Sequence, residues 1–289
     1  MKSVVSIHRH ELYGKLGNDL LVFLLDKMGL KTFPIHTVQI SNHTLTFDYI
    51  EIKSKNRNIL NYSINETETN EDFSNFYVRL TMSQSNVELS NYIDIIIKNI
   101  PFDTIHVLSS IFDNINKKHN IRYNLHGIII NLIPMADIVI LTQSELEKLT
   151  NIVIESFDDI ILACKALMNL GAKIILINDL LVKLDKQQTI MLGYNGQCYI
   201  TSHPELLFHL IDNRYLTSIL FIAALLESMS PLDALSYSNT VSYTAIKEAH
   251  DLEKNEINIL TTDGYMSNPI THFPIGKCIE DASITYYSF

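Results

Sequence analysis

The chain has 289 residues and a formal net charge of -10, with 22 Lys or Arg residues against 32 Asp or Glu residues. Apolar residues make up 47% and charged residues 19%, which excludes a disordered or low-complexity protein and fits one large α/β domain. The acidic balance, without a cluster of basic residues, argues against a nucleic-acid partner and against an anionic membrane surface.

The N-terminal half alternates short apolar strands with helical segments. Residues 18–28 carry apolar side chains at helical spacing, and Gly29 is expected to end that helix. The Asn-rich polar stretch at residues 46–75 predicts a flexible excursion or lid, which we place at roughly residues 41–80. Strands are expected at residues 4–7, 32–40, 76–80 and 104–108, and a second helix at residues 87–99.

The C-terminal half gives the clearest signals. Ser156, with Asp159 three residues later, opens a helix that runs to residue 170, and Gly171 caps it. Tyr194-Asn195-Gly196 predicts a hairpin turn between two antiparallel strands. Further strands are expected at residues 138–141, 173–177, 188–193 and 197–201, and helices at residues 144–149, 216–229 and 232–250.

Strands and helices that alternate through short connections indicate a mostly parallel sheet with helices on both faces. Because neither an internal repeat nor a linker divides the sequence, we expect a single domain over residues 1–289. The longest apolar run, residues 216–226, is far shorter than the roughly 20 residues of a membrane-spanning helix, and the N-terminus reads as a strand rather than a signal peptide.

The three cysteines, Cys164, Cys198 and Cys278, are scattered along the chain. They have neither metal-ligand spacing nor an even number for pairing, which is typical of a protein in a reducing cytosol. We therefore expect a cytoplasmic protein, with Cys164 as a core residue of a helix.

Glycine is scarce in this chain: there are nine residues, about 3% where about 7% is usual. None lies within residues 30–126 or 197–263. Phosphate-binding loops use glycine because the backbone must approach the anion with unobstructed N–H groups. Any phosphate site here must therefore be built with few glycines.

Three segments are more specific than the pattern of elements. Residues 6–18 read S-I-H-R-H-E-L-Y-G-K-L-G-N, residues 36–44 read H-T-V-Q-I-S-N-H-T, and residues 136–145 read A-D-I-V-I-L-T-Q-S-E. In this order they resemble the pyridoxal kinases of the ribokinase-like superfamily, whose motifs are S-I-Q-S-H-x-x-x-G-x-x-G-N, N-[ST]-V-Q-F-S-N-H-T-G and A-D-I-I-x-P-N-x-x-E. The resemblance covers essentially the whole chain, although residues 46–75 align poorly.

The resemblance implies a three-layer α/β/α fold with a small β lid, usually in a homodimer. It also implies phosphorylation of pyridoxal, pyridoxine or pyridoxamine on the 5′-hydroxyl, with ATP and Mg²⁺. Such a transfer needs a base near the hydroxyl, and N–H groups and cations around the γ-phosphate.

The family's base lies in a G-x-G-D segment that opens the penultimate helix. Here the matching residues are Asp212, Asn213, Arg214 and Tyr215, so both glycines are replaced and a tyrosine stands at the aspartate position. A phenol, with an ordinary pKa near about 10, is a poor general base at neutral pH. Asp212 is interpreted either as a helix N-cap or as a displaced base, and both readings stay open.

The nucleotide and metal positions are also altered relative to the family. Glu145 matches a glutamate near magnesium in the family, although the helix dipole alone favours a glutamate in a first turn. Asn178 and Asp179 occupy nucleotide-contacting positions, where the aspartate adds negative charge beside a polyphosphate. Asn213 and Arg214 would face the phosphates, and Arg214 is either a phosphate clamp or a solvated surface residue. We expect ATP affinity to be impaired.

The vitamer site keeps part of the family pattern. Four residues match positions that line the pyridoxal ring, and His43 is open to two readings, as a hydrogen-bonding partner of the ring or as a structural histidine. Arg9 replaces a serine that contacts the ring nitrogen, and Ser83 replaces a tyrosine of the lid. The four matching residues are Val38, Ile40, His43 and Thr44.

These replacements remove the base and the anion-hole glycines together. We therefore predict a pyridoxal kinase-like protein with little or no kinase activity. Three alternatives stay open: a silent vitamin B6-binding protein or partner subunit of an active paralogue, a working kinase that has compensated, for instance through Asp212 and Glu145, and a decaying gene product with no retained chemistry.

Overall fold

The computed structural model describes residues 3–11, 18–41, 50–53, 76–80, 105–109, 130–178, 180–181, 187–206, 213–253, 264, 272–279 and 283–286. Within them the chain separates into two compact units, Met1–Leu132 and Ile133–Phe289. The single domain with a lid at roughly residues 41–80 stays a prediction, and the expected helix at residues 87–99 lies outside the described residues.

The first unit contains a sheet in the order β5-β4-β1-β2-β3. Its central strands are parallel, while β3 runs antiparallel to β2. The predicted strands in this half are confirmed, and β3 is an additional one. The elements are β1 (Ser3–Glu11), α1 (Asn18–Lys27), β2 (Lys31–Ser41), β3 (Ile50–Lys53), β4 (Phe76–Leu80) and β5 (Ile105–Ser109).

Helix α1 packs on β1 and β2 through the apolar residues that predicted it. Leu21, Leu24 and Leu25 are fully buried. Gly29 follows the helix with φ of 73°, and the Leu30 N–H donates back to the Leu25 carbonyl at 2.9 Å. Since only glycine adopts this left-handed conformation without steric cost, the predicted helix end is confirmed.

The second unit contains a mixed six-stranded sheet in the order β11-β10-β9-β8-β7-β6. Strands β6 and β7 are parallel, and the remaining neighbours are antiparallel. The elements are β6 (Ile138–Thr142), α5 (Gln143–Thr150), α6 (Phe157–Asn169), β7 (Ile174–Asn178), β8 (Gln187–Tyr194), β9 (Gln197–Pro204), α7 (Asn213–Leu226), α8 (Pro231–Asp251), β10 (Ile275–Ile279) and β11 (Ser283–Tyr286), after a 3₁₀ turn at Ile133–Met135.

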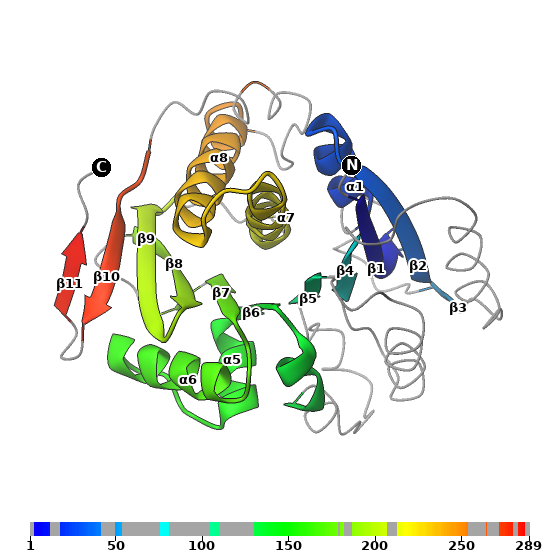
Figure 1. The fold of residues 1–289 in the computed structure, drawn as a ribbon. Coiled ribbons are helices and arrows are strands. Elements are labelled where there is room, and N and C mark those ends of the chain that lie inside the picture. Colours follow the sequence, from blue (N-terminus) through cyan, green and yellow to red (C-terminus); the bar gives the residue numbers. More distant parts are fainter. Residues whose placement is uncertain are drawn as a thin grey trace. The chain divides into compact units, whose positions relative to one another are not determined.

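Helices cover both faces of this second sheet (Figure 1). On one face α5 packs on β6 and β7, and α6 packs on β7, β8 and β9. On the other face α7 packs on β7, and α8 packs on β8 and β9. Burial from both sides explains why β6 and β7 read as continuous apolar runs rather than as alternating ones. Three layers with helices on both faces agree with the predicted fold class.

The predicted helix start at Ser156 is confirmed as a capping box. The Asp159 N–H donates to the Ser156 hydroxyl at 3.3 Å, and the Ser156 N–H donates to the Asp159 carboxylate at 2.9 Å. The hydrogen bond from the Ser156 hydroxyl lowers the pKa of Asp159. These bonds satisfy N–H groups that a helix start leaves without an intrahelical partner, so α6 begins where the sequence places it.

The predicted hairpin is confirmed between β8 and β9. Tyr194 pairs with Gln197, so the turn consists of Asn195 and Gly196 alone. Their φ angles are 51° and 72°, which is the type I′ geometry that Asn-Gly favours.

Among the described residues, no helix is both long and apolar enough to cross a membrane.

A histidine of β9 is buried in an aromatic cluster under α8. The ring of His203 lies 5.0 Å from that of Tyr243 and 6.1 Å from that of Phe273, centroid to centroid. Burial lowers the pKa of His203 from its ordinary 6.5, partly offset by the contact between its Nδ1 and the Pro204 carbonyl at 2.9 Å. The folded protein therefore holds His203 neutral.

The lowered pKa predicts a loss of stability in acid. As the pH falls below about 6.5, the unfolded chain takes up a proton at His203 before the folded chain does, so the free energy of unfolding decreases until the lower folded pKa is reached. His203→Phe, which keeps an aromatic ring in the cluster, should flatten this dependence in urea titrations between pH 7 and pH 5. The exposed His272→Gln serves as control, and an unchanged slope in His203→Phe would contradict the prediction.

Candidate functional site

The carboxyl ends of β6 and β7 place the predicted metal and nucleotide positions side by side. Thr142 ends β6, Asn178 ends β7, and the two residues pair in the parallel register. Ligands of open α/β sheets bind outside the carboxyl ends of parallel strands. This edge is therefore the candidate site of the second unit.

The predicted metal residue Glu145 forms the start of α5. Its Oε2 accepts the Thr142 N–H at 2.7 Å, and its own N–H donates to the Thr142 hydroxyl at 3.3 Å. Glu145 is only 5% exposed, so its carboxylate is buried and caps the helix. The spacing of Thr142 and Glu145 is itself a capping-box signal in the sequence. A metal role for Glu145 stays a prediction.

Asn178, predicted to contact the nucleotide, joins β7 to α7. Its Nδ2 donates to the Ser218 hydroxyl at 2.9 Å, and both side chains are almost fully buried. The hydrogen bond fixes the first turns of α7, which carry the residues predicted to match the family's G-x-G-D segment, against the end of β7. Asp179, the neighbouring prediction, lies outside the described residues.

Removing the Ser218 hydroxyl should destabilise the fold. Ser218→Ala leaves a buried amide donor of Asn178 without this partner, at an expected cost of about 1–2 kcal/mol in the free energy of unfolding. The double variant Asn178→Leu/Ser218→Ala should cost less than the sum of the two single changes, by about 1 kcal/mol. Urea titrations of all three variants measure this coupling, and strict additivity would refute it.

Gln143 is a site residue that the sequence did not single out. It is the first residue of α5 and 3% exposed. Its Oε1 accepts the Leu181 N–H at 2.8 Å, which holds the segment after β7, and its Nε2 donates to the Ile154 carbonyl at 3.4 Å. A glutamine has no distinctive pattern in the sequence, so only the structure reveals that it connects three segments at this edge.

Tyr215, at the position of the family's base, lies in the first turn of α7. It is 8% exposed, and the following Thr217 and Ser218 are also buried. Asn213 and Arg214 belong to the same helix, but only their backbone is described. Asp212 lies outside the described residues, so its two readings stay open.

In the first unit, two of the predicted vitamer residues, Arg9 and Val38, fall at an irregularity between β1 and β2. His8 pairs with His36 and His10 with Gln39, so one residue of β1, Arg9, opposes two of β2, which include Val38. Such bulges re-aim side chains and are common beside active sites. Ile40 pairs with Glu11 and with β3, while the predicted residues His43, Thr44 and Ser83 lie outside the described residues.

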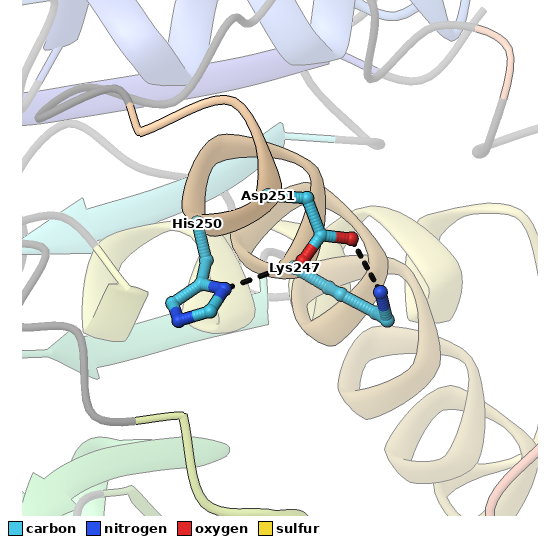
Figure 2. Close-up of polar contacts among 3 residues, drawn as sticks. All are labelled: Lys247, His250 and Asp251. Atoms are coloured by element: carbon cyan, nitrogen blue, oxygen red, sulfur yellow. Dashed lines mark hydrogen bonds and ion pairs between the residues drawn. The ribbon is translucent and has the colours of Figure 1, made fainter.

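Figure 2 shows a charged cluster of three side chains at the C-terminal end of α8. Lys247 and His250 both contact the Asp251 carboxylate, His250 through Nδ1 at 3.2 Å. The hydrogen bond from Lys247 lowers the pKa of Asp251, and the same contact raises the pKa of Lys247. All three side chains are exposed, so we interpret the cluster as a solvated helix end.

Among the described residues, no group of three His, Cys, Asp or Glu side chains has an arrangement that could hold a metal ion. At the carboxyl edge, Glu145 is the one acidic residue that the sequence comparison places near magnesium, and its Oε2 is committed to the helix cap. The described residues therefore do not fit a divalent-cation site of their own.

Comparison with known proteins connects this geometry to a family. No family model matches the chain. Pyridoxal kinase PdxY of Photobacterium profundum is 24% identical over 283 residues, which cover 96% of this chain and 97% of that protein. The chain is thus similar to the pyridoxal kinases along nearly its whole length.

Solved pyridoxal kinases share its fold. The crystal structure of the Entamoeba histolytica enzyme matches with a TM-score of 0.78 at 17% identity, over 99% of this chain and 100% of that one. Pyridoxal kinase from Leishmania donovani in complex with ADP and pyridoxamine matches with a TM-score of 0.78 at 15% identity, over 95% and 99%. The fold is thus ribokinase-like, as the sequence resemblance predicted.

Proposed function

We propose that the chain is a pyridoxal kinase-like protein of vitamin B6 salvage whose phosphoryl transfer is impaired or lost. The reaction in question is the ATP-dependent phosphorylation of pyridoxal, pyridoxine or pyridoxamine at the 5′-hydroxyl. The observation that carries the proposal is Tyr215, a buried side chain in the first turn of α7 at the position where the family has its aspartate base.

The chemistry at this helix start explains the impairment. A carboxylate accepts the proton of the hydroxyl as it attacks the γ-phosphate, whereas a phenol of ordinary pKa near about 10 is already protonated at neutral pH. The family's two glycines expose N–H groups to the transferring phosphoryl group. Replacing them by Asp212 and Arg214 adds side chains where positioned donors are worth about 10²–10³-fold in rate.

The residues predicted to bind metal and nucleotide support the same conclusion. Mg²⁺ bound together with ATP would supply positive charge that neutralises the phosphates. In this chain Glu145 caps α5 and Asn178 donates to Ser218, so two side chains predicted to serve metal and nucleotide already serve the fold. Because these side chains are already hydrogen-bonded within the fold, we expect weak nucleotide binding.

Vitamer binding is the property that we propose to be retained. The V-Q-I-S-N-H-T segment matches the family, and the bulge at Arg9 and Val38 gives β1 and β2 an irregular backbone there. The solved complex of the Leishmania donovani enzyme contains pyridoxamine. By analogy we propose pyridoxal or a related vitamer as the ligand, and a cytoplasmic homodimer as the working form.

Two binding measurements on the purified full chain test the proposal. Ultrafiltration with pyridoxal should retain the vitamer with the protein. Calorimetric titration with ATP and Mg²⁺ should show a Kd of about 1 mM or weaker. A pyridoxal kinase with an intact G-x-G-D motif is the positive control for both. Nucleotide binding as tight as in the control would contradict the impairment, and loss of vitamer binding would contradict the retained site.

A further inference from the structure

The three cysteines, scattered in sequence, meet in one buried cluster of the second unit. Cys164 comes from α6, Cys198 from β9 and Cys278 from β10, and all three are free thiols. Their side chains are 0%, 2% and 9% exposed. Spacing along the chain gives no indication of this convergence, since the residues are brought together by the packing of α6 and by two strand pairings.

The strand register shows how close the thiols are. Cys198 pairs with Gly193 of β8 on one side and with Cys278 of β10 on the other, so these positions form one row across the sheet. A Cβ atom on Gly193 would lie 2.4 Å from the Cys164 Sγ. The Cys164 thiol therefore occupies the space above Gly193, in the position next to Cys198. Paired residues of antiparallel strands have Cβ atoms about 4.5–5.5 Å apart.

The two neighbouring thiols interact directly. The Cys164 S–H donates to the Cys198 sulfur, which lowers the pKa of Cys198 and raises that of Cys164. Burial offsets part of this effect at Cys198, and Lys165 lowers its pKa further. For Cys278 burial is the main cause and raises the pKa to about 12. Since the thiolate is the reactive form, Cys198 is the member of the cluster best prepared to react.

The cluster is separate from the candidate site. Gly193 pairs with Ile175, near the amino end of β7, whereas the site lies at the carboxyl end of that strand. Within the described part of the chain, these thiols do not belong to any group of His, Cys, Asp or Glu side chains arranged to hold a metal ion. Oxidation between neighbouring thiols is therefore the chemistry that the arrangement favours over metal binding.

We propose that Cys164 and Cys198 form an intramolecular disulfide when the protein meets hydrogen peroxide, an oxidant small enough to enter the core. The Cys198 thiolate attacks one peroxide oxygen, the O–O bond breaks, and the leaving hydroxide takes a proton to become water. The sulfur of Cys164 then attacks the sulfenic sulfur of Cys198, the S–O bond breaks, and the departing oxygen leaves as a second water with the Cys164 proton. Two thiols and one peroxide thus give one disulfide and two waters.

The crosslink would join α6 to β9 and close the segment of residues 164–198. A covalent loop of this kind restricts the unfolded chain, so the oxidised protein should unfold at a higher temperature than the reduced protein. Oxidation would then protect the second unit without involving the candidate site.

Peptide mapping of the full chain tests the proposal. The folded protein is treated with hydrogen peroxide, remaining thiols are blocked with N-ethylmaleimide, and the digested chain is analysed by mass spectrometry. We expect a crosslinked peptide that contains Cys164 and Cys198, two hydrogens lighter than its parts, and one blocked thiol at Cys278. A Cys198–Cys278 crosslink, or three blocked thiols, would overturn the proposal.

Single variants add an independent readout. Cys278→Ala should still form the crosslink. Cys164→Ser, which keeps a hydrogen-bond donor beside Cys198 but cannot form a disulfide, should instead accumulate a sulfenic acid at Cys198, detected by labelling with dimedone. An unlabelled Cys198 in folded Cys164→Ser protein would overturn the assigned order of steps. If that variant does not fold, the mapping of the unmodified chain still decides the outcome.

Discussion

Phe221→Ala is expected to lower the free energy of unfolding by about 3–5 kcal/mol. Phe221 is the largest fully buried side chain of α7, the helix that carries Tyr215 at its start. Truncation removes apolar contacts and leaves a cavity that the surrounding helices and sheet fill only in part. The measurement is the shift of the urea unfolding curve at neutral pH.

The matched control for this change is Leu162→Ala on α6. Leu162 is 58% exposed, so its truncation should change the free energy of unfolding by less than about 1 kcal/mol. Equal losses in the two variants would contradict the burial of Phe221 in the core.

Gly193→Ala is expected to cost about 2–3 kcal/mol, although alanine is ordinarily tolerated in a strand. The added methyl group would lie 2.4 Å from the Cys164 Sγ and 3.4 Å from the Ile175 Cβ, both in the core under α6. Both side chains are fully buried, so the Cys164 side chain or α6 itself must shift away from β8. Urea unfolding again gives the magnitude.

A double variant isolates the cause of that loss. Gly193→Ala/Cys164→Gly restores the space above β8, so it should be more stable than the sum of the two single changes predicts. The glycine at position 164 costs about 1 kcal/mol of helix propensity by itself, and the Cys164→Gly single variant corrects for this. Additive losses would show that Gly193 matters for a reason other than the cysteine above it.

Local signals predicted much of the second unit. The capping box at Ser156 and the Asn-Gly turn between β8 and β9 each depend on a few neighbouring residues, and both lie where the sequence places them. Helices α7 and α8 were predicted from long apolar patterns and start within a few residues of the expected positions. Such signals predict the observed elements correctly because they do not depend on distant parts of the chain.

The strands that the sequence analysis missed are short and depend on their partners. Ile275–Ile279 contains Gly276 and Lys277, and Ser283–Tyr286 has four residues, so neither shows enough alternation to predict a strand. Each exists because an antiparallel neighbour supplies its hydrogen bonds. Strand β3 was missed for the same reason. It has four residues, of which only Ile50 and Ile52 are apolar, and it pairs with β2.

The roles predicted for the site residues stay predictions, although the elements that carry these residues could be predicted. Glu145 and Asn178 lie at the carboxyl edge of the sheet and Tyr215 at the start of α7. The family motif could not show that Glu145 closes a capping box or that Asn178 donates to Ser218. Those roles depend on side-chain directions at helix starts, and the role of Gln143 depends on a segment 38 residues further along the chain.

The rate of pyridoxal phosphate formation tests the central claim most directly. With saturating ATP, Mg²⁺ and pyridoxal, we predict a rate at least about 10²-fold below that of a pyridoxal kinase with an intact G-x-G-D motif. Tyr215→Phe should leave any residual rate unchanged, because the phenol is not the base. A rate within about tenfold of the intact enzyme, or a residual rate abolished by Tyr215→Phe, would contradict the account.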